Sequence, residues 1–437
     1  MKKLGVFFRI ALQYLWRYRR RYLFLFLALG FGFGVVTVVS SLKDGMKENL
    51  YLSAQSHYAG DIIAMGYERS GKINHHLTPA EIKAILDAAE TAGLDVSSAV
   101  LRTTVIGRNE GSVYFNGASA ILKYIVGADW EQERGFFKKL AYTGEPGLLG
   151  EDSILISAPA ARELGARQGD SITLETATVL GQKNTGTFVI GGIVEDASFF
   201  SYYKAYISRT ALNDLVGFPA EDCSIIGFFL PDRTKIETRR EAFQRELSFR
   251  IPTHPLVYDR EAFDNEIDNL GEGIHTLLIT LQVYLSEVAQ LMNAIDLASY
   301  VLQGMMMVII LVSAAVTCRL ILHERIRETG TMRAIGFYES DIRLIFKIEI
   351  FGAAILSLAA GFIIALAVNW FLSFTSFRWF PGFEVFMQDG RLSALYLPKT
   401  LGLNIIAVFG ILALAIWVPV FRNSRSPLPQ MLSGGAP

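Results

Sequence analysis

The sequence predicts an α-helical membrane protein with four transmembrane helices and a large α+β extracytoplasmic domain inserted between helices 1 and 2. Hydrophobic residues make up 51% of the 437 residues and charged residues only 19%, less than the roughly 25% of soluble domains. The charge is missing from four runs of about 20 residues or more, the length that crosses about 30 Å of hydrocarbon as a helix. These runs are Tyr22–Ser41, Leu297–Cys318, Ile350–Leu372 and Leu401–Val420.

The charges outside these runs are unevenly distributed. The first 41 residues carry seven basic groups and no acidic group, whereas residues 42–296 carry 23 basic and 35 acidic groups. The 319–349 segment has six basic residues, and Arg422 and Arg425 follow the last run. Because basic residues near the ends of a span stay on the cytoplasmic side, we expect both termini and the 319–349 loop inside and the acidic segment outside.

The first run is expected to remain as a membrane anchor. Its apolar stretch is longer than the roughly 7–15 residues of a signal-peptide core. No small-x-small cleavage site follows it, since Ser40-Ser41-Leu42-Lys43 continues into polar sequence. Before this run, Leu4–Trp16 forms either a helix along the inner membrane surface or an ordinary basic flank.

The outside segment is typical of a mixed α and β domain. Thr78–Gly93 has a Thr cap, a Glu three residues later and a terminal Gly, which predict a helix. Cys223 and Cys318 lie on opposite sides of the predicted membrane, so the domain has to fold without a disulfide between them. The other expected elements are a helical extension at Lys43–Ser53, strands at Asp61–Met65, Ser97–Ile106, Ser112–Phe115, Tyr124–Gly127, Ser171–Glu175 and Thr187–Val194, strand–helix units at Ser153–Gly165 and 203–216, and a helix at 234–249.

Residues 264–296 show apolar positions spaced by seven. This heptad pattern predicts a long helix that continues into the second run and projects from the membrane as a stalk, or a surface helix packed on its own domain. The stalk positions are Ile267, Leu270, Ile274, Leu277, Leu281, Tyr284, Val288, Leu291 and Ile295.

Motifs for catalysis or metal binding are weak, and we expect no catalytic and no metal-binding residue. Gly181–Thr187 lacks the Lys of a phosphate-binding loop and fits a hairpin turn. His75-His76 has no third ligand nearby. Gly30-x-x-x-Gly34 is either a helix-packing contact or a chance spacing. The four runs contain no charged residue, which argues against an ion-coupled carrier or channel. It favours a protein that works by moving instead of by conducting ions.

The 319–349 loop contains the most specific pattern in the chain. His323–Gly336 combines a charged helical end with breaks at Gly330 and Gly336, and a new helix is expected near Ser340. Two such breaks would isolate a short helix across the membrane face that can dock into a groove of a cytosolic partner. The alternative is a merely solvated, charged loop.

This loop resembles the ER-x-REIG-x-LRA-x-G signature of the FtsX-like (MacB-type) ABC transporter permease family. In that family a short coupling helix engages an ATP-binding-cassette ATPase. The resemblance implies ATPase coupling by Glu324, Arg325, Arg327, Glu328, Thr329, Gly330, Met332, Arg333, Ala334, Ile335 and Gly336. Met332 replaces the usual Leu, and Thr329 departs from the usual apolar residue. Ser153–Asp170 and Thr187–Val194 are similar to the MacB-like periplasmic core domain.

The resulting division of the chain has ten segments. They are a cytoplasmic amphipathic N-terminal segment (1–21), transmembrane helix 1 (22–41), an extracytoplasmic domain (42–263), a stalk helix (264–296), transmembrane helix 2 (297–318), a cytoplasmic loop with the coupling helix (319–349), transmembrane helix 3 (350–372), an extracytoplasmic loop (373–400), transmembrane helix 4 (401–421) and a cytoplasmic tail (422–437).

The size of the outside domain, the four spans and the short segment before the first span are most similar to the lipoprotein-releasing (LolC/LolE-like) branch. The resemblance implies a non-catalytic inner-membrane subunit that transmits ATP-driven motion, without a cofactor of its own, since ATP and Mg²⁺ bind the partner ATPase. Expected partners are that ATPase, an identical or related second permease, the lipid membrane, and a lipoprotein or periplasmic protein, but no nucleic acid. Two alternatives stay open: an FtsX-type regulator of a cell-wall hydrolase, and a membrane sensor or scaffold without an ATPase.

Overall fold

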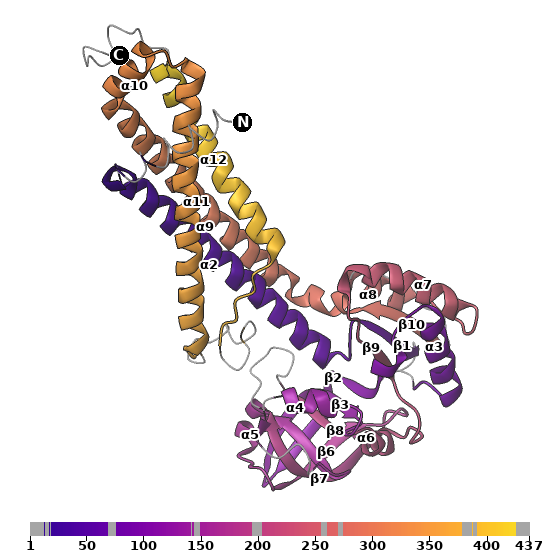
Figure 1. Cartoon of the computed structure of the whole chain (residues 1–437). Helices are drawn as coiled ribbons and strands as arrows, with labels where there is room; N and C mark the ends of the chain where they lie inside the picture. Colours follow the sequence, from indigo (N-terminus) through magenta and orange to yellow (C-terminus); the bar gives the residue numbers. More distant parts are fainter. Residues whose placement is uncertain are drawn as a thin grey trace. The chain divides into compact units, whose positions relative to one another are not determined.

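The computed structural model describes residues 13, 17, 19–68, 76–140, 142–143, 149–194, 203–254, 260–269, 274–377, 387 and 391–424 (Figure 1). The chain divides into two compact units. Met1–Glu48, Leu291–Phe377 and Arg391–Pro437 belong to a helical bundle, and Asn49–Gln290 and Arg378–Gly390 belong to a globular domain. Most of the expected N-terminal segment and of the expected C-terminal tail lies outside the described residues.

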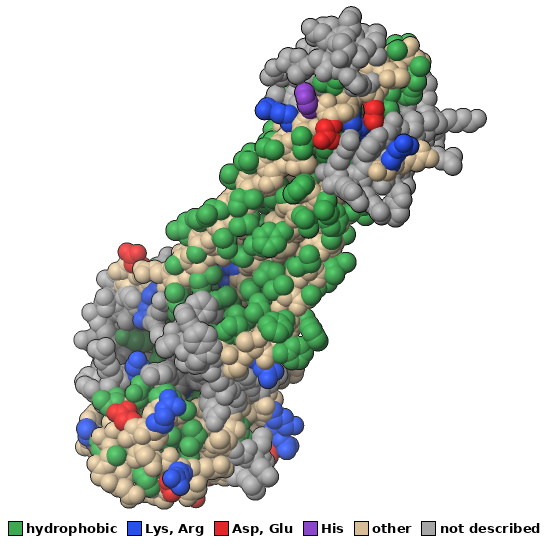
Figure 2. All heavy atoms as spheres, turned by 90° about the vertical axis from the view of Figure 1, so that its left-hand side faces the viewer, with side chains coloured by type: hydrophobic (Ala, Val, Ile, Leu, Met, Phe, Trp, Pro, Cys, Tyr) green, Lys and Arg blue, Asp and Glu red, His purple; other side chains and the backbone are tan. Residues whose placement is uncertain are grey.

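Four long helices form the bundle: α2 (Arg19–His57), α9 (Leu281–Glu324), α11 (Glu339–Phe374) and α12 (Pro398–Ser424). Each contains a stretch long and apolar enough to cross a membrane, with mean hydropathy between 2.2 and 2.5. Each also contains one of the four runs found in the sequence. Hydrophobic side chains cover the length of the bundle in Figure 2, as expected for a surface that faces lipid.

Helices α2 and α11 approach each other through glycines. A Cβ added at Gly361 would lie 2.3 Å from the carbonyl oxygen of Gly30, and one added at Gly34 would lie 3.1 Å from that of Gly361. Small residues let helix backbones come this close. The Gly30-x-x-x-Gly34 spacing is therefore a packing contact of α2 with α11.

Buried and half-buried polar side chains join all four long helices. The amides of Asn404 in α12 and Gln303 in α9 donate to the hydroxyl oxygen of Ser40 in α2, at 2.9 and 3.1 Å. The amide of Asn369 in α11 donates to the hydroxyl oxygen of Ser41 at 2.8 Å. An unpaired polar group is costly in an apolar surrounding, so these bonds specify which helix faces meet.

Charged residues continue this polar layer beyond the apolar runs. Lys47 of α2 pairs with Asp296 of α9. Lys43 lies 3.9 Å from Asp296 and 3.5 Å from Asp44, and its ammonium lies 5.1 Å from the centre of the Tyr300 ring. Lys43 and Asp44 are both buried. The charge-free runs end just before these residues, so the sequence did not predict the ion pairs.

The glycine contact predicts that two alanine variants differ in stability. Gly361→Ala places a methyl group against the α2 backbone and should destabilise the protein by about 1–3 kcal/mol, the usual cost of overpacking. Gly410→Ala in α12 meets no atom within 4 Å and should be neutral or slightly stabilising, because alanine favours helix. Melting temperatures of the purified variants in detergent test this, and equal melting temperatures would contradict the contact.

The globular domain is built on a mixed sheet of ten strands with the order β10-β1-β9-β2-β3-β8-β5-β7-β4, while β6 pairs with β2 and β7. The strands are β1 (Ile62–Glu68), β2 (Val100–Phe115), β3 (Ala118–Ala128), β4 (Tyr142–Thr143), β5 (Ser153–Ser157), β6 (Ser171–Ala177), β7 (Lys183–Val194), β8 (Lys204–Ser208), β9 (Ile225–Phe228) and β10 (Ile274–Thr280). The helices are α3 (Pro79–Thr91), α4 (Arg134–Lys139), α5 (Ala158–Leu164), α6 (Arg209–Val216), α7 (Ile236–Ser248) and α8 (Arg260–Asn269), with two 3₁₀ turns at Val96–Ser98 and Arg233–Lys235.

Six strands close into a ring. β2 pairs with β3, β3 with β8, β8 with β5, β5 with β7, β7 with β6, and β6 with β2. A ring of this size leaves an interior that side chains can fill. Its core contains Val113, Ile125, Ile154, Leu174 and Ile190, each almost fully buried.

The other lobe of the domain packs α3 and α7 against β1, β9 and β10. The Thr78 side chain accepts from the Glu81 N–H at the start of α3, and Glu81 accepts from the Thr78 N–H. This capping box confirms the helix predicted at Thr78–Gly93. Most strands and helices expected elsewhere in the domain are present, but the two strands expected at Ser97–Ile106 and Ser112–Phe115 form the single strand β2. Strand β3 is longer than predicted, and α4, α8, β4 and β9 were not foreseen.

The last turn of α2 is held inside this domain. The guanidinium of Arg102 and the ammonium of Lys204 donate to the carbonyl oxygen of His57, at 3.1 and 2.9 Å. Two cations at the negative end of a helix stabilise it. Arg102 also makes a buried bidentate pair with Glu133. Burial lowers the pKa of Arg102, but the carboxylate of Glu133 raises it by more than burial lowers it. The pKa therefore lies above its ordinary value.

The prediction of a stalk helix at 264–296 is wrong for part of that segment. Residues Ile274–Thr280 form strand β10, which pairs with the whole of β1, and α9 begins only at Leu281. The segment from Thr276 to Thr280 is buried at every residue, so its apolar spacing could not distinguish helix from strand. Its β-branched residues favour the strand.

The other stalk positions have different surroundings. Ile267 lies in α8, and Leu270 lies outside the described residues. In α9, Leu281 and Val288 are buried, Ile295 is half-buried and Leu291 is exposed. The heptad series is therefore divided among α8, β10 and α9.

Burial of Cys223 predicts an unreactive thiol. Both cysteines are free and buried, and burial raises the pKa of Cys223 to about 12. At pH 8 roughly one thiol in ten thousand would be ionised, and alkylation of the folded protein should keep rising about tenfold per pH unit up to pH 10. An ordinary thiol levels off above about pH 9. Iodoacetamide labelling followed by peptide mass spectrometry tests this, with denatured protein as the control, and rapid labelling of folded protein at pH 8 would contradict it.

Candidate functional site

A short helix lies between the second and third long helices of the bundle, at one end of it (Figure 1). This helix, α10 (Ile326–Ala334), follows α9 directly, with Arg325 at its N-cap. After it, Gly336 has a φ of +98°, a backbone conformation that glycine adopts without strain. Helix α11 then starts at Glu339. The turn at Gly336 therefore sets the direction change from α10 into α11.

The structure corrects one of the two expected helix breaks. Gly330 lies inside α10 and is buried there, and the break falls at Arg325 instead. A glycine in a helix costs about 1 kcal/mol relative to alanine, which packing of α10 against the bundle offsets. The short helix is accordingly longer than the segment between Gly330 and Gly336.

A buried ion pair fixes the start of α10 to α11. The guanidinium of Arg325 contacts both carboxylate oxygens of Glu349, at 3.0 and 2.7 Å, and the carboxylate of Glu328 at 2.9 Å. Arg325 is 2% exposed and Glu349 is fully buried. The guanidinium also lies 5.0 Å from the centre of the Phe346 ring. These contacts join three successive helical segments in one place.

The charge of Arg325 is retained despite its burial. Burial lowers the pKa of the guanidinium, but the carboxylates of Glu349 and Glu328 raise it by more, so the pKa lies above its ordinary value. An arginine is in any case charged at every physiological pH. The pair therefore acts as a fixed ionic contact.

The predicted coupling residues divide into two faces. Arg325, Thr329 and Gly330 face inward, as does Ile326, which was not among the predicted residues. The Thr329 hydroxyl donates to the Arg325 carbonyl oxygen at 3.0 Å. Met332 packs against the bundle core. Thr329 thus departs from the family pattern on the side of α10 that contacts its own bundle.

The other face of the site carries exposed apolar groups. Ile335 is 72% exposed and Tyr338 is 73% exposed, and Glu324, Ala334 and Gly336 are also exposed. Exposed apolar side chains that lie together mark interaction sites when they form a continuous patch. Tyr338 was not among the residues predicted from the sequence.

Ion pairs hold the turn that follows α10. Glu339 contacts Arg333 at 3.2 Å and Arg343 at 3.0 Å. Arg333 is therefore engaged with the start of α11. The side chain of Arg327 lies outside the described residues.

Sequence reasoning missed Glu349, the partner that gives Arg325 its role. The signal was present, because Glu349 directly precedes the charge-free run Ile350–Leu372. An acidic residue at the edge of such a run is a candidate for pairing with a basic residue of the neighbouring loop.

Other candidate chemistry finds little support in the structure. Among the described residues, no group of three or more His, Cys, Asp or Glu side chains could hold a metal ion. His76 lies 3.6 Å from Asp222 and against the ring of Phe218, while His75 lies outside the described residues.

Family comparisons cover both units of the chain. Residues 300–428, which include α10, match the model of the FtsX-like permease C-terminal region. Residues 23–236 match that of the MacB-like periplasmic core domain. The chain belongs to the FtsX-like, MacB-type permeases. Permeases of this family are generally non-catalytic transmembrane subunits of ABC transporters. The family and the four apolar helices indicate an inner-membrane protein.

Other comparisons add little to this assignment. A search of curated proteins found no match to this permease. The crystal structure of the periplasmic region of MacB from Actinobacillus actinomycetemcomitans is similar with a TM-score of 0.28 and 11% identity, over 53% of this chain and 94% of that chain. A TM-score this low carries no structural argument.

The buried pair predicts that substitutions of Arg325 and Glu349 have non-additive effects on the stability of this permease. Glu349→Leu leaves Arg325 buried without its main counter-charge and should cost about 3–5 kcal/mol. The double variant Arg325→Leu/Glu349→Leu removes both charges and should regain most of that loss, because replacing a buried pair by apolar side chains is often close to neutral. Thermal unfolding of the two single variants and the double variant in detergent measures the coupling. Additive losses would contradict a direct ionic contact.

Proposed function

We propose that this permease transmits motion driven by ATP hydrolysis from a separate cytosolic ABC ATPase to its globular domain. In this proposal both chain termini and α10 are cytoplasmic and the globular domain is extracytoplasmic. The observation that carries it is α10 itself, a short helix anchored to the bundle on one face and exposing Ile335 beside it. The basic residues of the 319–349 segment support this orientation.

The geometry of α10 suits docking into a groove of a partner. A helix that inserts into a groove needs apolar anchors on one face and a fixed orientation. Ile335 and Tyr338 supply exposed apolar groups, and the Arg325–Glu349 pair supplies the fixed orientation. The expected partner is therefore a protein with an apolar groove, as the family resemblance to ATPase-coupled permeases also implies.

Motion at α10 has a defined route through the bundle. Arg325 lies between α9 and α10 and binds Glu349 of α11, so a displacement of α10 would move the adjoining ends of both long helices. The polar bonds of Ser40 and Ser41 connect α2 to α9, α11 and α12. Both α2 and α9 continue into residues of the globular domain.

We further propose a second permease, identical or related, and lipoprotein release as the transported activity. Two ATPase subunits form their sites together and each would need one docking helix. The cargo proposal rests on the resemblance of the layout to the lipoprotein-releasing branch: one helix, a large domain and three further helices. Activation of a cell-wall hydrolase is the alternative for the globular domain.

Substitution of Ile335 tests the ATPase proposal. Tagged protein is isolated from its native membrane in mild detergent and the bound proteins are identified by mass spectrometry. We expect an ABC ATPase with the wild type and at least a tenfold smaller amount with Ile335→Glu, because the charge would be placed in an apolar groove. Leu180→Glu is the matched control, since Leu180 is also a largely exposed apolar residue, at 85%, in the globular domain.

Two outcomes would overturn the coupling proposal: no ATPase with the wild type even after crosslinking, or equal amounts with the wild type and Ile335→Glu. The cargo is tested separately by depleting the protein in cells and following newly made lipoproteins. Their accumulation in the inner membrane supports lipoprotein release, whereas normal lipoprotein sorting with defective cell separation supports the hydrolase alternative.

A further inference from the structure

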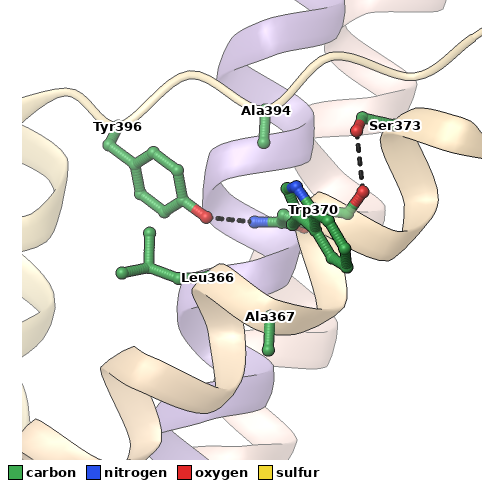
Figure 3. A pocket seen from close by; sticks show the side chains of 7 residues that line it. Leu366, Ala367, Trp370, Ser373, Ala394 and Tyr396 are labelled. Carbon is green, nitrogen blue, oxygen red and sulfur yellow. Dashed lines mark hydrogen bonds between the residues drawn. The ribbon is translucent and has the colours of Figure 1, made fainter.

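A pocket of about 520 Å³ lies at the C-terminal end of α11, within the volume range of small-molecule sites. Leu366, Ala367 and Trp370 form its wall on α11, and Ala394 and Tyr396 form the facing wall. In Figure 3 the side chains of Ala394 and Tyr396 point from a segment without helix or strand toward α11. We name residues 391–397 the strap.

The strap is held firmly against the bundle. The N–H of Leu395 donates to the carbonyl oxygen of Ser41 at 2.9 Å. The strap backbone at Ser393 passes so close to α2 that a Cβ at Gly45 would lie 2.0 Å from the Ser393 carbonyl oxygen. The ring of Tyr396 packs edge-on against Phe362 at 5.9 Å. The pocket therefore has two fixed walls.

One end of the pocket is polar. Asn369 is 6% exposed, and its amide nitrogen donates both to Ser41 and to the Tyr396 hydroxyl oxygen, the latter at 2.7 Å. A hydroxyl that accepts a hydrogen bond keeps its proton for donation. The amide oxygen of Asn369 has no hydrogen-bond partner among the described residues. Tyr396 and Asn369 thus offer a neutral donor and a neutral acceptor.

The remaining surface of the pocket is apolar and reaches the lipid-facing side of the bundle. Trp370 is 67% exposed and Leu366 is 41% exposed, on a helix apolar enough to span a membrane. None of the seven lining residues is charged, so a phosphate or ammonium group would find no counter-charge among them. An uncharged carbonyl joined to an alkyl chain matches both parts of the pocket.

We propose that this pocket binds the acyl chain of an acyl ester or acyl amide that enters from the bilayer, with its carbonyl oxygen accepting from the Tyr396 hydroxyl. The alkyl chain lies between Leu366 and Trp370 on one side and Ala394 on the other. Such a chain belongs to a membrane phospholipid or to an acylated protein. The site does not depend on an ATPase, so its test can fail or succeed independently of the coupling function.

Photo-crosslinking in vesicles tests the site. The full-length protein is reconstituted in phosphatidylethanolamine and phosphatidylglycerol vesicles that contain either a phospholipid or a diacylated lipopeptide with a diazirine on its acyl chain. Adducts are mapped by peptide mass spectrometry. We expect labelling concentrated on peptides that contain Trp370 or Ala394, at least fivefold above that of the lipid-facing residues of α9. The more effective probe identifies the source of the chain.

Pocket variants decide between a site and general lipid contact. Ala394→Trp fills the pocket and should reduce the labelling of the Trp370 peptide at least fivefold. Ile363→Trp is the matched control, because Ile363 is 65% exposed on α11 and does not line the pocket; it should leave labelling unchanged. Tyr396→Phe keeps the ring but removes the donor, and should reduce labelling severalfold.

Melting temperatures establish that each variant is folded. Uniform labelling along α9, α11 and α12 would overturn the proposal. So would equal labelling of the wild type and folded Ala394→Trp. If Ala394→Trp does not fold, Ala367→Trp, which fills the pocket from its α11 wall, takes its place and is interpreted in the same way.

Discussion

The need to satisfy polar groups inside an apolar bundle organises this protein. At the α10 end, Arg325 and Glu349 neutralise each other in a buried contact. Toward the opposite end of the long helices, Lys47 pairs with Asp296. Polar groups without partners would be strongly unfavourable in such surroundings. Each pair can therefore form only when the correct helices meet. A third pair of helices, α2 and α11, meets through the glycine contact.

Polar groups also need partners at the end of α2 in the globular domain. The last carbonyl groups of any helix lack partners within it, and α2 ends in a buried location. Arg102 and Lys204, which come from two different strands, donate to the carbonyl oxygen of His57. Glu133 balances the charge of Arg102. The end of α2 is thereby fixed by the strands of the domain, so this helix is anchored by tertiary contacts as well as by its sequence.

The sequence predicted what depends on local pattern and missed what depends on distant partners. Charge-free runs located all four long helices, and a capping box located α3. Strand β10 was mistaken for a helix because burial on both faces gave it no alternating pattern, and its pairing with β1 lies about two hundred residues away in the chain. The loop signature located α10, but only the fold shows that Thr329 faces the bundle and that Glu349 is the partner of Arg325. The strap and its pocket left no signal, since they depend on contacts of residues 391–397 with α2 and α11.

The ring of six strands has a consequence for recognition. Proteins often bind one another by adding a strand to an exposed sheet edge. In the described residues, each of the six strands already has a neighbour on both sides. This part of the domain is therefore protected from unwanted strand exchange with other proteins. A binding partner would have to recognise side chains at the ends of the ring, such as the exposed Leu180 in the turn between β6 and β7, through surface shape and chemistry instead of backbone pairing.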